Sequence, residues 1–176
     1  SIECANQLGS EYVVIPWLED TLRSQLDDYK RIAQKANEAA LLCKKAGLKL
    51  AYHNHDFEFT KFGDQTGYGI LLQETDKKLV DFELDLYWVV RSGNDPLQLF
   101  QNHAGRFTMW HVKDMDKNNP AWNAEIGEGN INFKAIFAQA KASGMQHFFV
   151  EQETNYSPNP MESIKASCQY VSKQLL

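Results

Sequence analysis

The chain has 176 residues, of which 43% are hydrophobic and 23% charged, and this composition is typical of a folded domain with its own core. Its formal net charge is -5 with acids and bases interspersed, so we expect no nucleic-acid partner, which would require a basic face. No apolar run approaches the roughly 18 residues that span a bilayer, so we expect no membrane partner either.

Five segments rich in β-branched or aromatic residues predict β-strands. In chain order they cover residues 12–17, 49–55, 81–88, 107–113 and 146–152. Helical patterns separate them. Each strand with its helix makes a unit of roughly 25 to 40 residues, and such alternation predicts a parallel sheet with right-handed crossovers.

The clearest helix has apolar residues at spacings of four and three from Leu22 to Cys43, with Thr21 expected as its N-cap and Gly47 just beyond its end. Shorter helices are predicted over residues 69–75, from Asp95 to near Gly105, over residues 133–143 after Asn132, and from Pro160 onward after Asn159. In the last helix the apolar stripe consists of Met161, Ile164, Cys168, Val171 and Leu175.

The three cysteines, Cys4, Cys43 and Cys168, are an odd number and widely spaced, so we expect reduced, buried thiols rather than disulfides. A reducing compartment fits them, and we expect a cytoplasmic protein. The N-terminal SIECANQLGS is not a signal peptide. An export signal could still lie in a part of the protein that precedes this chain.

An open parallel sheet is an alternative architecture, and such sheets often bind nucleotides through a glycine-rich turn after the first strand. Here the first strand runs into IPWLEDTL, which contains no glycine, so this alternative is less favoured. The longest loop, residues 115–131, follows the fourth predicted strand, where loops usually shape a substrate pocket.

Metal-capable side chains lie at the ends of four predicted strands: His53 and His55, Asp85, His111, and Glu151. The carboxyl ends of parallel strands in a (β/α) barrel meet at one mouth, where active sites are built. Imidazole and carboxylate ligands suit a divalent cation such as Mn, Co, Fe or Zn. The pattern therefore predicts one metal site.

Several segments resemble the sugar phosphate isomerase/epimerase superfamily, the xylose isomerase-like TIM barrels that also include inosose dehydratase and endonuclease IV. The matching segments are GLKLAYHNHDFEF, ELDLYWVVRSGNDP, HVKDMD, IGEGNINF and FFVEQE. The resemblance implies an α/β fold, a TIM (β/α)8 barrel present here as a partial barrel, strands four to eight. It also implies a single domain over residues 1–176, preceded by about 100 absent residues.

In this family one divalent metal (Mn, Co, Zn, Fe or Mg) is held by residues of the last four strands. The resemblance assigns Asp85, His111 and Glu151 as ligands, and places His53 where family members often have glutamate. A second departure is Trp88, where many members have a histidine; with the acidic charge it argues against the trinuclear zinc nuclease branch.

Other side chains near these positions have open roles. His55 and Lys113 are candidates to bind substrate and to move a proton, beside Glu151 as a possible base. Lys113 could instead pair with Asp114 or Glu151. Trp17 and Trp88 could bind substrate or belong to the core. Glu83 is expected in buried packing or a salt bridge, and Glu58 is a weaker substitute ligand on a flexible loop.

The resemblance implies a metal-dependent isomerase or epimerase of a sugar or sugar phosphate that acts through an enediolate. A dehydratase or lyase acting on a keto-sugar or keto-inositol shares that intermediate and is one alternative. A sugar-binding barrel without catalysis is the other. The expected partner is a small sugar or keto-polyol, with a homo-oligomer possible.

Overall fold

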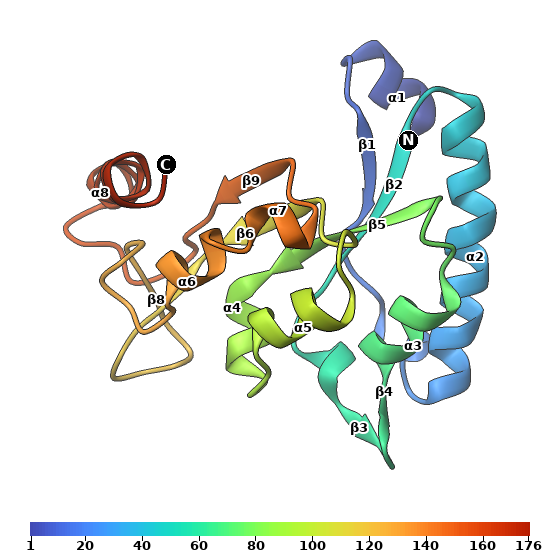
Figure 1. The fold of residues 1–176 in the computed structure, drawn as a ribbon, viewed down its shortest axis with the longest axis horizontal. Coiled ribbons are helices and arrows are strands. Elements are labelled where there is room, and N and C mark those ends of the chain that lie inside the picture. Colours follow the sequence, from blue (N-terminus) through green and yellow to red (C-terminus); the bar gives the residue numbers. More distant parts are fainter. The chain divides into compact units, whose positions relative to one another are not determined.

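The computed structural model describes residues Ser1–Leu176 and divides into two compact units, which we call the N-terminal unit (Ser1–Glu83) and the C-terminal unit (Leu84–Leu176). The main sheet has the strand order β1-β2-β5-β6-β9, with helices between successive strands (Figure 1). This order confirms the predicted βα alternation. None of the helices has the combined length and apolar character that a membrane span requires.

The N-terminal unit is built on parallel pairing of β1 with β2 and of β2 with β5. Its elements are α1 (Ile2–Gln7), β1 (Tyr12–Ile15), the 3-10 turn η1 (Asp20–Leu22), α2 (Leu26–Lys45), β2 (Lys49–His53), η2 (Phe57–Phe59), the hairpin β3 (Lys61–Phe62) and β4 (Gln65–Thr66), α3 (Gly67–Glu74) and β5 (Val80–Asp85), whose last two residues belong to the C-terminal unit.

The C-terminal unit contains the parallel pair β6 and β9 and a short antiparallel pair, β7 with β8. Its elements are α4 (Leu86–Arg91), α5 (Pro96–Asn102), β6 (Met109–Val112), β7 (Asp114–Met115), β8 (Asn123–Ala124), α6 (Phe133–Phe137), α7 (Ala140–Ser143), β9 (His147–Val150) and α8 (Pro160–Gln174). Each predicted strand therefore exists, with shorter ends than the sequence indicated.

Helix α2 begins four residues later than predicted, and Thr21 is not its cap. Thr21 lies in η1, and the helix starts after Gln25, which forms a capping box with Asp28. The helix buries a stripe of Tyr29, Ala33, Ala36, Ala40 and Cys43, as the periodicity predicted. Gly47 follows its end with φ +79°, a conformation that glycine adopts without strain.

Two further predictions are wrong in detail. The strand predicted over residues 81–88 ends at Asp85, because the Asp85 carboxylate accepts a hydrogen bond from the Trp88 amide and caps α4. The helix predicted over residues 133–143 is interrupted between Phe137 and Ala140.

Helix α8 begins after Asn159 as predicted but buries only part of the predicted stripe. Ser163, Ser167 and Val171 are buried, whereas Met161 is 71% exposed and Cys168 is exposed. The expectation of buried thiols is correct for Cys43 and wrong for Cys168 and Cys4, both of which are exposed.

Candidate functional site

Asp85 ends β5 in a fully buried position. One carboxylate oxygen accepts the Trp88 amide hydrogen at 3.1 Å and the other lies 3.8 Å from Nδ1 of His111. Burial raises the pKa of Asp85 to about 7, and the positive charge of Lys113 opposes that rise. A carboxylate held in this way is stabilised by a nearby cation, because a cation offsets the cost of burying its charge.

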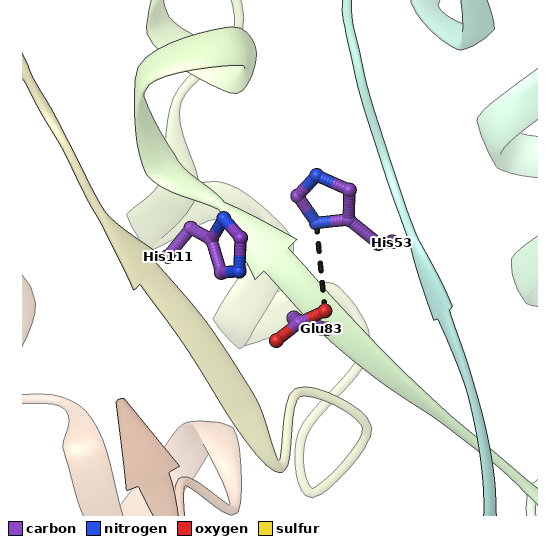
Figure 2. Close-up of side chains that lie close together, drawn as sticks. All are labelled: His53, Glu83 and His111. Carbon is purple, nitrogen blue, oxygen red and sulfur yellow. Dashed lines mark ion pairs between the residues drawn. The ribbon is translucent and has the colours of Figure 1, made fainter. Parts of the chain in front are cut away.

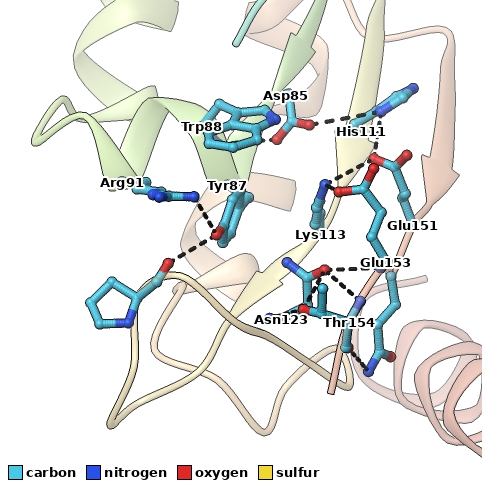
Figure 3. Close-up of polar contacts among 12 residues, drawn as sticks. Asp85, Tyr87, Trp88, Arg91, His111, Lys113, Asn123, Glu151, Glu153 and Thr154 are labelled. Carbon is cyan, nitrogen blue, oxygen red and sulfur yellow. Dashed lines mark hydrogen bonds and ion pairs between the residues drawn. The ribbon is translucent and has the colours of Figure 1, made fainter. Parts of the chain in front are cut away.

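His111 on β6 lies between two carboxylates. Its Nδ1 is 3.0 Å from Oε2 of Glu151, which follows β9, and 3.8 Å from Oδ2 of Asp85 (Figure 3). Ligand-capable atoms of these three residues all lie within 4.8 Å of one another. One imidazole and two carboxylates make a donor set that fits a borderline divalent cation, and the C-terminal unit supplies all three.

Lys113 lies beside this cluster with only 1% of its surface exposed. Its Nζ donates to Glu153 and lies 3.5 Å from Oε2 of Glu151. It also lies 5.2 Å from the ring centroid of Tyr87 and 5.5 Å from that of Trp88, distances typical of cation–π contacts. Burial lowers the pKa of Lys113, but Glu153, Asp85 and Glu151 outweigh it and raise the pKa above its usual value. Lys113 is therefore a fixed cation.

The loop of residues 115–131 is folded around the carboxylate of Asp114, which is fully buried. Four main-chain amides donate to this carboxylate, those of Met115, Gly127, Gly129 and Ile131, at 2.8 to 3.2 Å. Burial raises the pKa of Asp114, and these hydrogen bonds oppose the rise. Asp114 therefore anchors the loop and does not pair with Lys113, which was one of the alternatives left open by the sequence.

Two more contacts fix the same loop. The hydroxyl of Tyr87 on α4 donates to the carbonyl of Pro120 at 2.9 Å and accepts a hydrogen bond from Arg91. The side chain of Asn123 accepts hydrogen bonds from the amides of Glu153 and Thr154 (Figure 3). The loop is thus tied both to α4 and to the segment after β9. Lys113 contacts Tyr87 of α4 and Glu153 of that segment.

In the N-terminal unit, His53 at the end of β2 lies beside Glu83 of β5. Nδ1 of His53 is 3.7 Å from Oε2 of Glu83, and both side chains are buried (Figure 2). The neighbouring strands are in register at this pair, which explains their proximity. The expectation that Glu83 would enter buried packing or a salt bridge fits this arrangement.

His55, two residues further on, lies in an aromatic cluster after the ends of β1 and β2. Its ring is 4.6 Å from Trp17, edge-to-face, and stacks on Phe57 at 5.7 Å. The Arg23 guanidinium covers Phe57 at 3.6 Å and Trp17 at 5.3 Å. Trp17 nevertheless remains 47% exposed. The cluster therefore presents a fixed aromatic surface to solvent.

Glu58 is not on a flexible loop, as the sequence suggested, but fully buried in η2. Its carboxylate accepts hydrogen bonds from the Tyr52 hydroxyl at 2.8 Å and from the His55 amide at 2.9 Å. Burial raises the pKa of Glu58 to about 7. These contacts tie η2 to β2 and place the carboxylate in the packing of the N-terminal unit.

The structure thus brings Asp85, His111, Lys113 and Glu151 together within the C-terminal unit, with Trp88 beside them. Sequence reasoning missed Glu153 and Asn123. Glu153 had a signal, because it lies two residues after Glu151, where an extended chain returns to the same side. Asn123 had none, since only the fold of the loop places it beside Glu153.

The whole chain is similar to known proteins. The family described as "Xylose isomerase-like TIM barrel" matches residues 1–174. An inosose dehydratase of Clostridium perfringens is 22% identical over 96% of this chain, and one of Geobacillus thermodenitrificans is 24% identical over 94%. The chain spans 67% and 65% of those two proteins.

Solved structures agree with the family match. A sugar phosphate isomerase/epimerase from Parabacteroides distasonis superposes with a TM-score of 0.85 at 30% identity, covering 98% of this chain and 61% of that one. The IOLI protein, whose crystal structure contains a zinc atom, superposes with a TM-score of 0.73 at 19% identity, covering 97% of this chain and 65% of that one. The predicted resemblance and fold class are confirmed.

Proposed function

The chain belongs to the xylose isomerase-like TIM barrel family, and from that premise we propose that it is part of a metal-dependent isomerase or epimerase acting on a sugar or sugar phosphate. One observation carries the proposal: Asp85, His111 and Glu151 present their ligand-capable atoms within 4.8 Å of one another. His53 is the remaining ligand that the family pattern assigns, and its role stays a prediction.

A divalent cation bound there would supply Lewis acidity, polarising a substrate carbonyl and acidifying the neighbouring C–H. Asp85, His111 and Glu151 would hold it. Lys113 is a poor base, since the carboxylates around it keep it protonated. We propose that Lys113 stabilises the negative charge that develops on the substrate oxygen when the C–H proton leaves.

The proton itself must go to a basic side chain within hydrogen-bond reach of the substrate. Glu151 and His55 are the candidates for this role. Return of the proton to the neighbouring carbon gives isomerisation, and return to the opposite face gives epimerisation. Trp17 and Trp88 are the proposed substrate-binding rings. Trp17 is 47% exposed within its aromatic cluster, and the ring of Trp88 lies 5.5 Å from Nζ of Lys113.

Dehydration of a keto-sugar or keto-inositol is the second candidate. It starts with the same loss of a proton, followed by departure of a β-hydroxyl. Two points favour it: the similar proteins include inosose dehydratases, and the family resemblance places His53 where paired-base epimerases are expected to have a glutamate. Lys113, a fixed cation, suits a leaving hydroxyl as well as it suits an enediolate oxygen.

Metal content and solvent exchange test the proposal together. We expect near one divalent ion per chain in protein purified without chelator, measured by elemental mass spectrometry. Keto-sugars incubated in D2O should then exchange the proton next to the carbonyl, and Glu151→Gln should abolish the exchange. Product analysis separates the two candidates, because only dehydration releases water and gives an unsaturated or diketo product. Metal binding without exchange or turnover would favour the non-catalytic sugar-binding barrel.

A further inference from the structure

Lys113 and the proposed metal compete for the same carboxylate. Oε2 of Glu151 lies 3.0 Å from Nδ1 of His111 on one side and 3.5 Å from Nζ of Lys113 on the other. A carboxylate oxygen that is drawn toward an ammonium group is less available to a divalent cation. The cation is also repelled by the charge of Lys113 at this short range.

Glu153 provides Lys113 with a second carboxylate. The two residues form a hydrogen-bonded ion pair in which Lys113 is buried and the Glu153 side chain is 58% exposed. An exposed carboxylate gains little from an ion pair when it must order its own side chain and backbone. The pair is therefore strong only if something else holds the Glu153 backbone in place.

Asn123 holds that backbone. Its side-chain oxygen accepts hydrogen bonds from the amides of Glu153 at 2.9 Å and Thr154 at 3.2 Å. The main-chain amide of Asn123 donates a hydrogen bond to the Thr154 hydroxyl at 3.0 Å. Asn123 is buried, with 2% of its surface exposed. Figure 3 shows this chain of contacts running from Asn123 through Glu153 to Lys113.

We infer that Asn123 is a positioning residue for the metal site: by fixing Glu153 against Lys113, it leaves Glu151 available to the metal. The inference rests on the proposed function, since it needs the metal site of Asp85, His111 and Glu151. The side-chain hydrogen bonds of Asn123 go to Glu153 and Thr154, so it acts on the metal site through Glu153 and Lys113.

Mn²⁺ affinity of the whole protein, measured by electron paramagnetic resonance, tests this without any substrate. Asn123→Ala should weaken Mn²⁺ binding about fivefold, because the ion pair of Lys113 with the half-exposed Glu153 is lost and such a pair contributes about 1 kcal/mol. Glu153→Gln should weaken Mn²⁺ binding by a similar factor while keeping the hydrogen bond from the main-chain amide of residue 153 to Asn123. This second variant keeps the test meaningful if Asn123→Ala unfolds.

Lys113→Met supplies the decisive comparison. Alone it should strengthen Mn²⁺ binding, because the competitor for Glu151 is gone. Combined with Glu153→Gln or Asn123→Ala, it should reduce the loss of affinity to less than about twofold, since those changes act through Lys113. Tyr87→Phe is the control: it removes the hydroxyl contact to Pro120 from the same loop and should leave the affinity unchanged.

Each result decides the inference. Wild-type affinity in a folded Glu153→Gln protein overturns it, and so does a loss that persists in full when Lys113 is replaced by methionine. Both outcomes leave the proposed function intact, because wild type still binds Mn²⁺. A wild-type protein that binds no divalent ion removes the metal site itself, and with it both the proposed function and the role of Asn123.

Discussion

The two units surround their strand-end residues in different ways. In the N-terminal unit His55 lies among aromatic rings, and the buried carboxylate of Glu58 is held by a tyrosine hydroxyl and a main-chain amide. In the C-terminal unit His111 and Lys113 lie among carboxylates, and a buried aspartate organises the neighbouring loop. The same type of parallel sheet edge thus carries two environments.

This difference indicates a division of roles. Aromatic rings around a histidine offer an apolar surface for a substrate and few charges for chemistry. Clustered carboxylates, imidazole and ammonium groups supply metal ligands and charge stabilisation. We therefore expect changes at Asp85 and Asp114 to affect the metal and the loop, and changes at Glu58 and Trp17 to affect the pH dependence of stability and substrate binding.

The largest effect should come from Asp114→Ala, which leaves four main-chain amides without their acceptor. We expect a loss of about 4 kcal/mol in the free energy of unfolding, since each buried unpaired amide costs on the order of 1 kcal/mol. Urea denaturation measures it. Glu128→Ala, an exposed carboxylate in the same loop, should change stability little, and equal losses in the two variants would contradict the anchoring role.

Glu58 should make the N-terminal unit less stable at neutral than at mildly acidic pH. Its pKa is raised from 4.5 to about 7 by burial. A raised pKa in the folded state means that the stabilisation is complete below pH 4.5 and is lost as pH rises through about 7. The size of the loss is about 3 kcal/mol, since one pKa unit corresponds to about 1.4 kcal/mol.

Stability curves of wild type and Glu58→Gln between pH 4 and 8 measure this effect. Their difference should follow the titration of Glu58, because glutamine cannot ionise. Glu38→Gln, at an exposed position on α2, is the matched control and should follow wild type. A constant difference between wild type and Glu58→Gln across the range would show that Glu58 ionises normally in the fold.

Asp85→Asn should weaken divalent-metal binding by about a hundredfold, because it replaces a charged ligand with a neutral amide. Asparagine caps helices as well as aspartate, so the start of α4 should be preserved. Asp95→Asn makes the same change at the exposed cap of α5 and should leave the affinity unaltered. Calorimetric titration with Mn²⁺ compares the two, and similar affinities would exclude Asp85 as a ligand.

Helices α2 and α8 extend the comparison of the two units, because both carry an apolar stripe, and α8 buries Val171 of its stripe but leaves Met161 and Cys168 exposed. On α8 we expect Val171→Ala to cost about 1.6 kcal/mol, from roughly two buried methylene equivalents. Met161→Ser, at an exposed position, should cost less than about 0.5 kcal/mol. Thermal unfolding of this chain distinguishes the two, and a larger loss from Met161→Ser would show that Met161 is buried together with Val171.

The smallest expected effect concerns Trp17. Trp17→Ala should raise the KM for the keto-sugar that shows proton exchange by about fivefold and leave kcat nearly unchanged, because stacking on an aromatic ring contributes on the order of 1 kcal/mol. Trp17→Phe keeps a ring and should recover most of the loss. A fall in kcat with an unaltered KM would instead place Trp17 at the reacting atoms.

Much of the fold could be predicted because the relevant patterns are local. The stripe on α2, the caps at Asp95, Asn132 and Asn159, and the apolar cores of the strands depend on residues a few positions apart. Element ends were less predictable. Asp85 reads as part of a strand, yet its carboxylate caps α4, and only its contact with the Trp88 amide reveals this.

The candidate site could be predicted in part for a similar reason. Strand ends in a parallel sheet meet at one edge, so Asp85, His111 and Glu151 were expected to converge before any distance was known. The partners of Lys113 and Asp114 were not predictable. Lys113 pairs with Glu153 and Asp114 binds main-chain amides from up to 17 residues away, since a loop fold decides which groups reach a buried charge.

The sequence by itself determined the alternation of strands and helices, the family, and the residues that could bind a metal, because these depend on local periodicity and on side-chain chemistry. Only the tertiary structure decided which face of α8 is buried, that Lys113 is a fixed cation, and that Asn123 holds Glu153. The physical reason is that burial and hydrogen bonding of distant residues depend on neighbours that no local pattern identifies.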